Sequence, residues 1–466
     1  MPLAENDTVS TIGDGGRRVW LYPLRVWGRF VTARTVFGWL LFAILLIAPW
    51  IDVGGHPAMM FDIPRRRFYL WGLTLFATDA NYLLFLFGSF IFSVFFFTAL
   101  LGRVWCGWAC PQTVFLEGII RPIEQLIEGK PSQRKKLDNA PWTAGKIWKK
   151  GLKLSAFLVV AGAISTTVVA YFIGREGIFE AQADPFSRPV ATSIFIGLTA
   201  VLMFDFTWFR EQTCIVACPY GRFQSVLMDA DSLTIGYDVA RGEPRGKARD
   251  PNAGDCVDCR KCVQVCPTGI DIRKGVQMEC INCTACIDAC DSIMDKLGRE
   301  RGLIRYTSEN ALATGKVRLM RPRVIIYAVM LLAIGTGFAT ALTLREPVEI
   351  AVTRPPGDPF VVRPDGQLQN MVRLRIANKS DAPHTFTATV VAPADGTLHA
   401  PIAQMTVAPE QVGQFPLLLV RPKADARRTP FVIRVDGDDG YTDTVEAVFL
   451  APPPAEGDTD GGFDEG

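Results

Sequence analysis

The chain has 466 residues, of which 49% are apolar and 21% charged, and its formal net charge is only +2. This near-neutral charge excludes the broad positive field of a nucleic-acid-binding protein, and the length predicts two or three domains. The apolar residues are gathered in long runs, which excludes a wholly soluble protein and indicates membrane-spanning helices.

Residues 1–35 are predicted to be a cytoplasmic N-terminal segment. Acidic residues interrupt its first 19 positions and no small-residue cleavage pattern follows the first apolar run, so it does not resemble a cleavable signal peptide. Five arginines precede that run, and positive charge favours the cytoplasmic side of a membrane. They are Arg17, Arg18, Arg25, Arg29 and Arg34.

Five apolar runs are long enough to cross a membrane, which takes about 20 residues. The first four define a predicted membrane domain over residues 36–209, and the fifth a helix over residues 323–344. The short apolar run Leu70–Thr78 is interpreted as an interfacial or re-entrant piece, with an extra span as the alternative. The five runs are Val36–Ile51, Tyr82–Leu101, Leu152–Ile173, Val190–Phe209 and Val324–Leu344.

The distribution of Lys and Arg predicts how the chain is oriented in the cytoplasmic (inner) membrane. The loop between Arg121 and Lys153 and the segment 210–322 are both rich in basic residues, which places them in the cytoplasm. The triplet Arg65–Arg67 conflicts with this orientation, but the larger loops outweigh it. We therefore expect a multi-pass protein whose C-terminal domain is periplasmic.

Two copies of the pattern Cys-x2-Ala-Cys-Pro follow the second and fourth spans and form an internal repeat. If a helix continues through each motif, its two cysteines share one face, and two such pairs would offer four thiolates to one metal. Three interpretations stay open: a copper site, since soft thiolates favour Cu(I); a further cluster or a redox-active dithiol; or buried structural cysteines. The residues are Cys106, Cys110, Cys214 and Cys218.

Two cysteine runs in the basic segment 210–322 have the spacing of bacterial ferredoxins. In such a run three thiolates reach one [4Fe–4S] cluster, and the fourth reaches the other cluster. Structural zinc also uses paired Cys-x2-Cys, but it has no need of the additional Cys-x3-Cys. The predicted ligands of cluster one are Cys256, Cys259, Cys262 and Cys290, and those of cluster two are Cys280, Cys283, Cys286 and Cys266. Asp291 replaces the proline that usually ends the second run.

Residues 345–451 predict an all-β domain without cysteines. Alternation of apolar and polar residues, as in Val372–Ile376 and Phe431–Val435, is typical of half-buried strands. About seven strands in roughly 100 residues favour an immunoglobulin-like (Ig-like) sandwich. The acidic, Pro- and Gly-rich tail 452–466 is expected to be disordered.

Other cofactors find little support in the sequence. The chain has only three histidines, His56, His384 and His399, and no pair of them lies within the spans, which argues against a bis-histidine haem. It has no Rossmann or Walker motif, which argues against a bound nucleotide.

The ordered combination of two membrane Cys-x3-Cys-Pro motifs, a two-cluster ferredoxin insert, a fifth span and a C-terminal Ig-like domain resembles the CcoG family, also called FixG or RdxA. Those proteins are accessory factors for assembly of cbb3-type cytochrome c oxidase. The resemblance covers nearly the whole chain. It implies a membrane-bound cupric reductase that works with the copper-assembly proteins of the oxidase, and it implies that Cys106, Cys110, Cys214 and Cys218 bind copper or a cofactor.

We therefore expect an oxidoreductase that takes electrons from an unidentified donor through two [4Fe–4S] clusters to the four membrane cysteines, where Cu(II) is reduced. One alternative is a quinol dehydrogenase resembling NapH, which shares the membrane motifs and the ferredoxin runs. Another is a non-enzymatic scaffold for oxidase assembly, in which the sandwich docks a partner. A homodimer is left open, and no nucleic-acid partner is expected.

Overall fold

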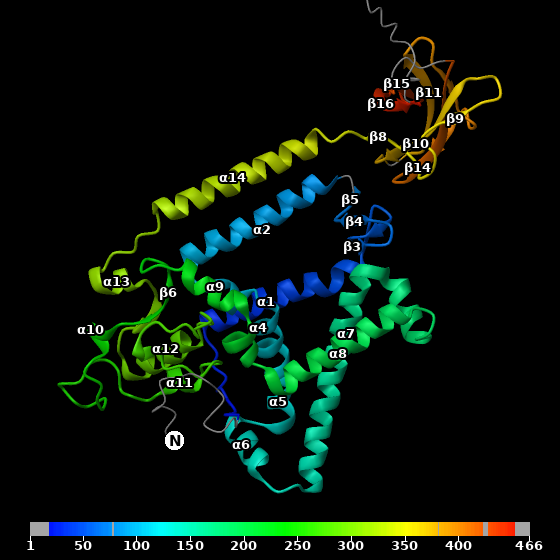
Figure 1. The fold of residues 1–466 in the computed structure, drawn as a ribbon. Coiled ribbons are helices and arrows are strands. Elements are labelled where there is room, and N and C mark those ends of the chain that lie inside the picture. Colours follow the sequence, from blue (N-terminus) through cyan, green and yellow to red (C-terminus); the bar gives the residue numbers. More distant parts are fainter. Residues whose placement is uncertain (1–17, 77–78, 381, 423–426, 453–466) are drawn as a thin grey trace, which may run out of the picture. The chain divides into compact units, whose positions relative to one another are not determined.

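The computed structural model describes residues 18–76, 79–380, 382–422 and 427–452. The chain divides into two compact units, Met1–Thr340 and Ala341–Gly466. Within the described residues, five helices are long and apolar enough to cross a membrane, as the sequence predicts. Figure 1 labels the helices that carry these spans: α1 (Arg29–Ile47), α2 (Ala80–Leu101), α7 (Ala144–Ala183), α8 (Pro189–Phe204) and α14 (Pro322–Thr343).

Helix α7 has 40 residues, more than a membrane span needs, because it consists of two helical segments joined at a sharp kink. At Gly174 the backbone has φ 73° and ψ 168°, which residues with a Cβ adopt only under strain. A Cβ at this position would also lie 3.6 Å from the side chain of Met60. The glycine therefore lets the chain leave the first helical segment and return toward α8, against which α7 packs (Figure 1).

The apolar run after Leu70 is a strand, so the extra span considered for it is wrong. Strands β3 (Met59–Asp62), β4 (Arg67–Leu70) and β5 (Leu73–Phe76) form an antiparallel sheet in that order. The arginine triplet lies at the turn of the first hairpin, where Arg65 pairs with Asp62 at 3.2 Å and Arg67 stacks over Phe76. Two of the three arginines of the triplet thus have partners within this small sheet. The last two residues of the run, 77 and 78, lie outside the described residues.

Short helices follow the spans and carry the cysteine motifs. The first group comes after α2 and the second after α8, and each contains a helix that begins at a Cys-Pro pair. They are α3 (Val104–Trp108), α4 (Pro111–Phe115), a π-helical turn Leu116–Ile120, α5 (Arg121–Glu128), α6 (Pro131–Asn139), two further π-helical turns Asp205–Phe209 and Thr213–Ala217, and α9 (Pro219–Leu227).

The ferredoxin-like part is built on a two-stranded antiparallel sheet, β6 (Thr234–Tyr237) with β7 (Ile304–Thr307). Between these strands lie α10 (Val239–Gly242), α11 (Lys261–Gln264) and α12 (Ala285–Leu297), and α13 (Glu309–Thr314) follows β7. Helix α12 is joined directly to the membrane helix α1. The carboxylate of Asp288 accepts hydrogen bonds from the backbone N–H groups of Phe30 at 3.3 Å and Val31 at 2.7 Å, which caps the N-terminus of α1.

The second unit is a two-sheet sandwich, as the alternation of apolar residues predicts. The side chains of Leu374, Ile376, Phe431, Ile433 and Val435 are fully buried between its sheets. Its described residues form nine strands where the sequence predicts about seven, because β9 and β12 are too short to show alternation. One sheet has the order β12 (Thr397–His399), β14 (Val412–Arg421), β10 (Leu368–Asn378), β8 (Val348–Thr353), with β9 (Val361–Val362) also paired to β10; the other has the order β13 (Met405–Val407), β11 (His384–Ala392), β15 (Arg428–Gly437), β16 (Thr442–Leu450).

Candidate functional site

The eight ferredoxin cysteines line two neighbouring cavities. Cys262 lines both of them, so the cavities share a wall. Apart from this shared residue, each cavity is lined by cysteines of one run and the last cysteine of the other, which is the grouping expected from the spacing. One cavity is lined by Cys256, Cys259, Cys262 and Cys290 and the other by Cys266, Cys280, Cys283 and Cys286.

The backbone of both cysteine loops is shaped for cluster binding. Asp258 and Arg260 in the first loop, and Asn282 and Thr284 at the equivalent positions of the second, all have φ between 50° and 66°. Non-glycine residues keep this left-handed conformation only where the surrounding structure enforces it, and alternating backbone conformations turn successive N–H groups toward a bound anionic group. An all-cysteine donor set on such loops fits [4Fe–4S] clusters.

Burial favours the neutral thiol at five of the predicted cluster ligands, Cys262, Cys280, Cys283, Cys286 and Cys290. It raises the pKa of Cys262 and of Cys280 to about 12. Metal binding must therefore release protons from this core, because the thiolate is the ligand.

Asp291, which departs from the ferredoxin pattern, has a structural role of its own. Its carboxylate accepts a hydrogen bond from the backbone N–H of Gly302 at 3.0 Å. Because no proline follows Cys290, helix α12 continues without interruption to Leu297. The substitution thus fixes the chain that leads into β7 and leaves the cysteine in place.

The two membrane motifs are a structural repeat as well as a repeat in sequence. Four residues before the first cysteine of each motif, Gly102 (φ 57°, ψ −128°) and Arg210 (φ 50°, ψ −119°) make the same sharp turn at the end of a membrane helix. Cys110 and Cys218 are both N-cap residues with extended backbone, and each is followed by proline in the first turn of a helix. The helix therefore does not continue through either cysteine pair, since proline interrupts it.

The repeat brings its four cysteines near one another even so. Burial raises the pKa of Cys106 to about 12, and a negative charge at Cys110 or Cys218 would raise it further. Burial likewise raises the pKa of Cys214, and a negative charge on any of the other three cysteines would raise it further. The charge of each thiolate would thus affect its neighbours, which places the four cysteines in one protected region of the fold.

Polar side chains that the sequence did not single out surround these cysteines. Cys106 Sγ donates to Gln224 Oε1 at 3.0 Å, and the amide of Gln224 donates to the hydroxyls of Thr98 and Tyr220 at 3.1 and 2.8 Å. An isolated glutamine in a short helix carries no spacing signal that could have revealed this role.

Asp205, an ionisable residue within the fourth span, joins the two halves of the repeat. Its Oδ1 accepts hydrogen bonds from Thr213 Oγ1 at 2.6 Å and from Gln112 Nε2 at 3.1 Å. Gln112 also donates to the backbone carbonyl of Arg210 at 3.0 Å. The residue after the first Cys-Pro pair is thereby fixed to the chain that leads into the second motif.

Two of the membrane cysteines lie against the ferredoxin core. Cys106 and Cys214 pack on the core that contains Cys280 and Cys283. A Cβ added at Gly107 would lie only 2.5 Å from the carbonyl oxygen of Ile281 and 2.7 Å from that of Asn282. The backbone beside Cys106 therefore touches the backbone between two predicted ligands of cluster two.

Hydrogen bonds hold this contact in place. Arg103 donates to the carbonyl of Cys280 at 3.4 Å and also to that of Gly221 in α9. Trp108 Nε1 donates to the Tyr306 hydroxyl at 3.1 Å, which in turn donates to the carbonyl of Asn282 at 3.3 Å. Both membrane motifs are thus tied to the ferredoxin-like part through buried contacts.

We expect the substitution Gly107→Ala to disrupt this contact. The added methyl has no room against backbone atoms, and because a displacement of 1 Å in a site can cost about 100-fold, electron delivery to the membrane cysteines should slow by about tenfold or more. Electron transfer to an acceptor that binds at those cysteines, measured with iron content in parallel, tests this. Gly197→Ala is the control, because no heavy atom of the described chain lies within 4 Å of a Cβ built there. Equal rates in the two variants would contradict the contact.

The fold and the site define a membrane-bound iron–sulfur electron-transfer protein. Family models agree: a 4Fe-4S dicluster domain matches residues 209–309, a 4Fe-4S binding domain matches residues 82–132, and the Ig-like fold at the C-terminus of FixG matches residues 338–452. A crystal structure of a FixG-related protein from Vibrio parahaemolyticus is 20% identical, covers 23% of this chain and 97% of its own, and has a TM-score of 0.21.

Two curated relatives identify the family. Protein RdxA of Cereibacter sphaeroides is 38% identical over 79% of this chain and 82% of its own length. Nitrogen fixation protein FixG of Rhizobium meliloti is 32% identical over 93% of both chains. The chain belongs to the FixG/RdxA family, which confirms the resemblance found in the sequence.

Proposed function

We propose that this protein reduces Cu(II) to Cu(I), with Cys106, Cys110, Cys214 and Cys218 binding the copper substrate. The packing of Cys106 and Cys214 against the core that contains Cys280 and Cys283 supports the proposal most directly. Soft sulfur ligands favour Cu(I) over Cu(II), so they stabilise the product of a one-electron reduction. The clusters, when bound at the eight ferredoxin cysteines, supply electrons one at a time, and each Cu(II) ion takes one.

The product would serve the assembly of cbb3-type cytochrome c oxidase. The resemblance to the FixG/RdxA family supports this role, and so does the membrane location of the cysteine motifs at the ends of α2 and α8. In the orientation that the basic loops favour, the clusters face the cytoplasm and the sandwich faces the periplasm. Copper carriers of the oxidase would then be the partners of the protein.

Copper reduction by the purified protein tests the proposal. Protein with reconstituted clusters is reduced chemically, freed of reductant and mixed with one equivalent of Cu(II), and Cu(I) is counted with a chromogenic chelator. We expect one Cu(I) to form for each electron that the clusters lose. Cluster oxidation without Cu(I) formation would overturn the proposal.

A second candidate function is oxidation of a membrane quinol, and a cavity beside the clusters favours it. The cavity lies between α1, α5 and the ferredoxin-like part, and its lining includes Trp39, Arg34, Glu117 and Pro267. Pro267 directly follows the ligand Cys266, and Arg34 donates to the carbonyl of Cys283 at 3.0 Å. An amphipathic headgroup in this cavity would lie next to cluster two and near a carboxylate able to accept its proton. Quinol-dependent bleaching of the clusters, lost in Glu117→Gln, would support this function.

A third iron–sulfur cluster is the other candidate for what the four membrane cysteines bind. The 4Fe-4S binding model that matches residues 82–132 includes Cys106 and Cys110, which supports this alternative. Iron and sulfide stoichiometry separates the two cases, because a third cluster adds four irons to the eight that two clusters contain.

A further inference from the structure

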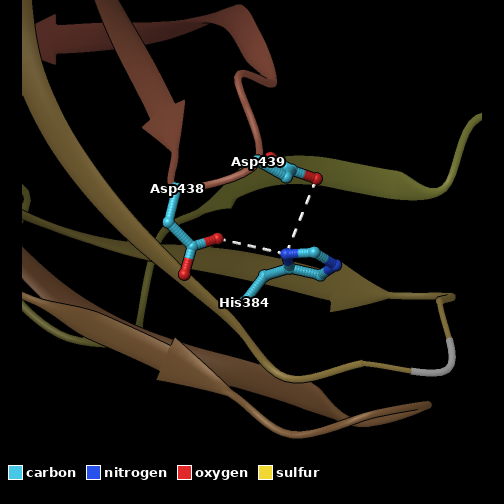
Figure 2. Close-up of side chains that lie close together, drawn as sticks. All are labelled: His384, Asp438 and Asp439. Carbon is cyan, nitrogen blue, oxygen red and sulfur yellow. Dashed lines mark hydrogen bonds and ion pairs between the residues drawn. The ribbon is translucent and has the colours of Figure 1, made fainter.

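A histidine and two aspartates meet at one end of the sandwich. His384 is the first residue of β11, and Asp438 and Asp439 form the turn between β15 and β16. His384 Nδ1 lies 3.1 Å from Asp438 Oδ1 and 3.6 Å from Asp439 Oδ2, and one ligand atom from each of the three residues lies within 4.8 Å of the others. Figure 2 shows the imidazole facing both carboxylates.

The carboxylates are held in place by their other oxygens. Asp438 Oδ2 accepts a hydrogen bond from the backbone N–H of Thr385 at 3.0 Å, and Asp439 Oδ1 accepts one from that of Tyr441 at 3.0 Å. Each carboxylate thus keeps one oxygen directed at the imidazole. The turn itself is closed by a hydrogen bond from the N–H of Gly437 to the carbonyl of Tyr441 at 2.7 Å.

The imidazole is also held in place. Only 16% of the His384 side chain is exposed, and its ring lies 6.4 Å from that of Phe386, which is fully buried in the sandwich core. The donors therefore sit on a rigid strand end and a closed turn, which is the support that a metal site requires.

We propose that His384, Asp438 and Asp439 form a binding site for a divalent transition-metal ion, with Cu(II) as the probe. Bonds of about 2.0–2.2 Å place adjacent donors on one ion about 2.8–3.5 Å apart. The distance of 3.1 Å from His384 Nδ1 to Asp438 lies in this range, and the 3.6 Å to Asp439 requires only a small approach. Two carboxylates neutralise the charge of the dication, and the ion takes the place of a proton on Nδ1. One imidazole nitrogen with carboxylate oxygens suits Cu(II), whereas Cu(I) prefers sulfur. The proposal does not depend on copper reduction at the membrane cysteines.

The test uses the three histidines of the chain as markers. One equivalent of Cu(II) is added to the full-length protein with oxidised, EPR-silent clusters and with Cys106, Cys110, Cys214 and Cys218 changed to serine. Electron spin-echo modulation then reports whether an imidazole nitrogen is bound. We expect the signal of one imidazole, its loss in His384→Gln and its retention in the matched control His399→Gln, which alters a second histidine of the same domain.

The aspartates provide a second readout that does not depend on His384 variants. The double change Asp438→Asn and Asp439→Asn should weaken Cu(II) binding by about tenfold or more, since it removes both charged donors. Zn(II) should raise the unfolding temperature of the protein with the four membrane cysteines changed to serine, but not that of the same protein with both aspartates also changed. Imidazole modulation that persists in His384→Gln, or its absence from the unaltered protein, would show that the three residues form only an ion-paired turn.

Discussion

Changing Cys106, Cys110, Cys214 and Cys218 together to serine is expected to lower the rate of Cu(II) reduction more than about 100-fold, because even outer-shell partners of a metal site contribute 10–100-fold. Serine is nearly isosteric with cysteine but offers a hard oxygen donor, so it does not stabilise Cu(I). The four residues lie outside the two ferredoxin cavities. Iron and sulfide content should therefore remain that of the unaltered protein.

The two cysteine pairs provide an internal control for this prediction. If all four thiols belong to one site, the variant Cys106→Ser with Cys110→Ser should lose as much activity as the fourfold variant, because residues that act as a unit have non-additive effects. The same holds for Cys214→Ser with Cys218→Ser. Each pair retaining half of the activity would indicate two separate sites, and full activity in the fourfold variant would remove the site from the function altogether.

Spacing predicts the ferredoxin-like part well because chemistry dictates that spacing. A cubane cluster accepts only a few loop lengths, so eight cysteines suffice to suggest two crossed ligand sets. Membrane spans can be predicted equally well, since a helix needs about 20 apolar residues to cross a bilayer. The run after Leu70 is different: a short apolar segment suits a strand or a helix, and only its pairing with β4 decides that it is β5.

The surroundings of the membrane cysteines could be predicted only in part. Duplication of the motif pointed to Cys106 and Cys214, but the contacts around these residues join distant parts of the chain. Gln224 lies 118 positions from Cys106, and Arg103 lies 177 positions from Cys280. Such contacts arise from tertiary packing of helix ends, and no local pattern records them.

Glu124→Gln is expected to destabilise the membrane-proximal helices by about 3–5 kcal/mol, the usual cost of leaving a buried charge without its partner. Glu124 on α5 is 1% exposed and makes a two-fold ion pair with Arg210 at 2.6 and 3.0 Å. It also pairs with Arg134 of α6 and lies 3.9 Å from Lys153 of α7. After the change, Arg210 would keep its longer ion pair with Glu211, 3.6 Å from its Nε.

The pKa of Glu124 predicts how the stability that it contributes depends on pH. Burial alone would raise the pKa of Glu124, but the charge and hydrogen bonds of Arg210, with the charges of Arg134 and Lys153, outweigh it and lower the pKa to about 2. An unfolded glutamate has a pKa of about 4.3. Because the folded pKa is the lower one, the stabilisation is complete above about pH 4.3 and is lost as the pH falls toward 2.

Thermal unfolding in detergent at several pH values measures both effects. The unfolding temperature of Glu124→Gln should lie well below that of the unaltered protein at pH 7, and the difference should shrink as the pH falls below about 4. Glu180→Gln is the matched control, because it removes an ion pair with Arg188 whose side chains are about half exposed, and such pairs contribute about 1 kcal/mol or less. Similar losses in the two variants would mean that the buried network does not hold α5 to the ends of α7 and α8.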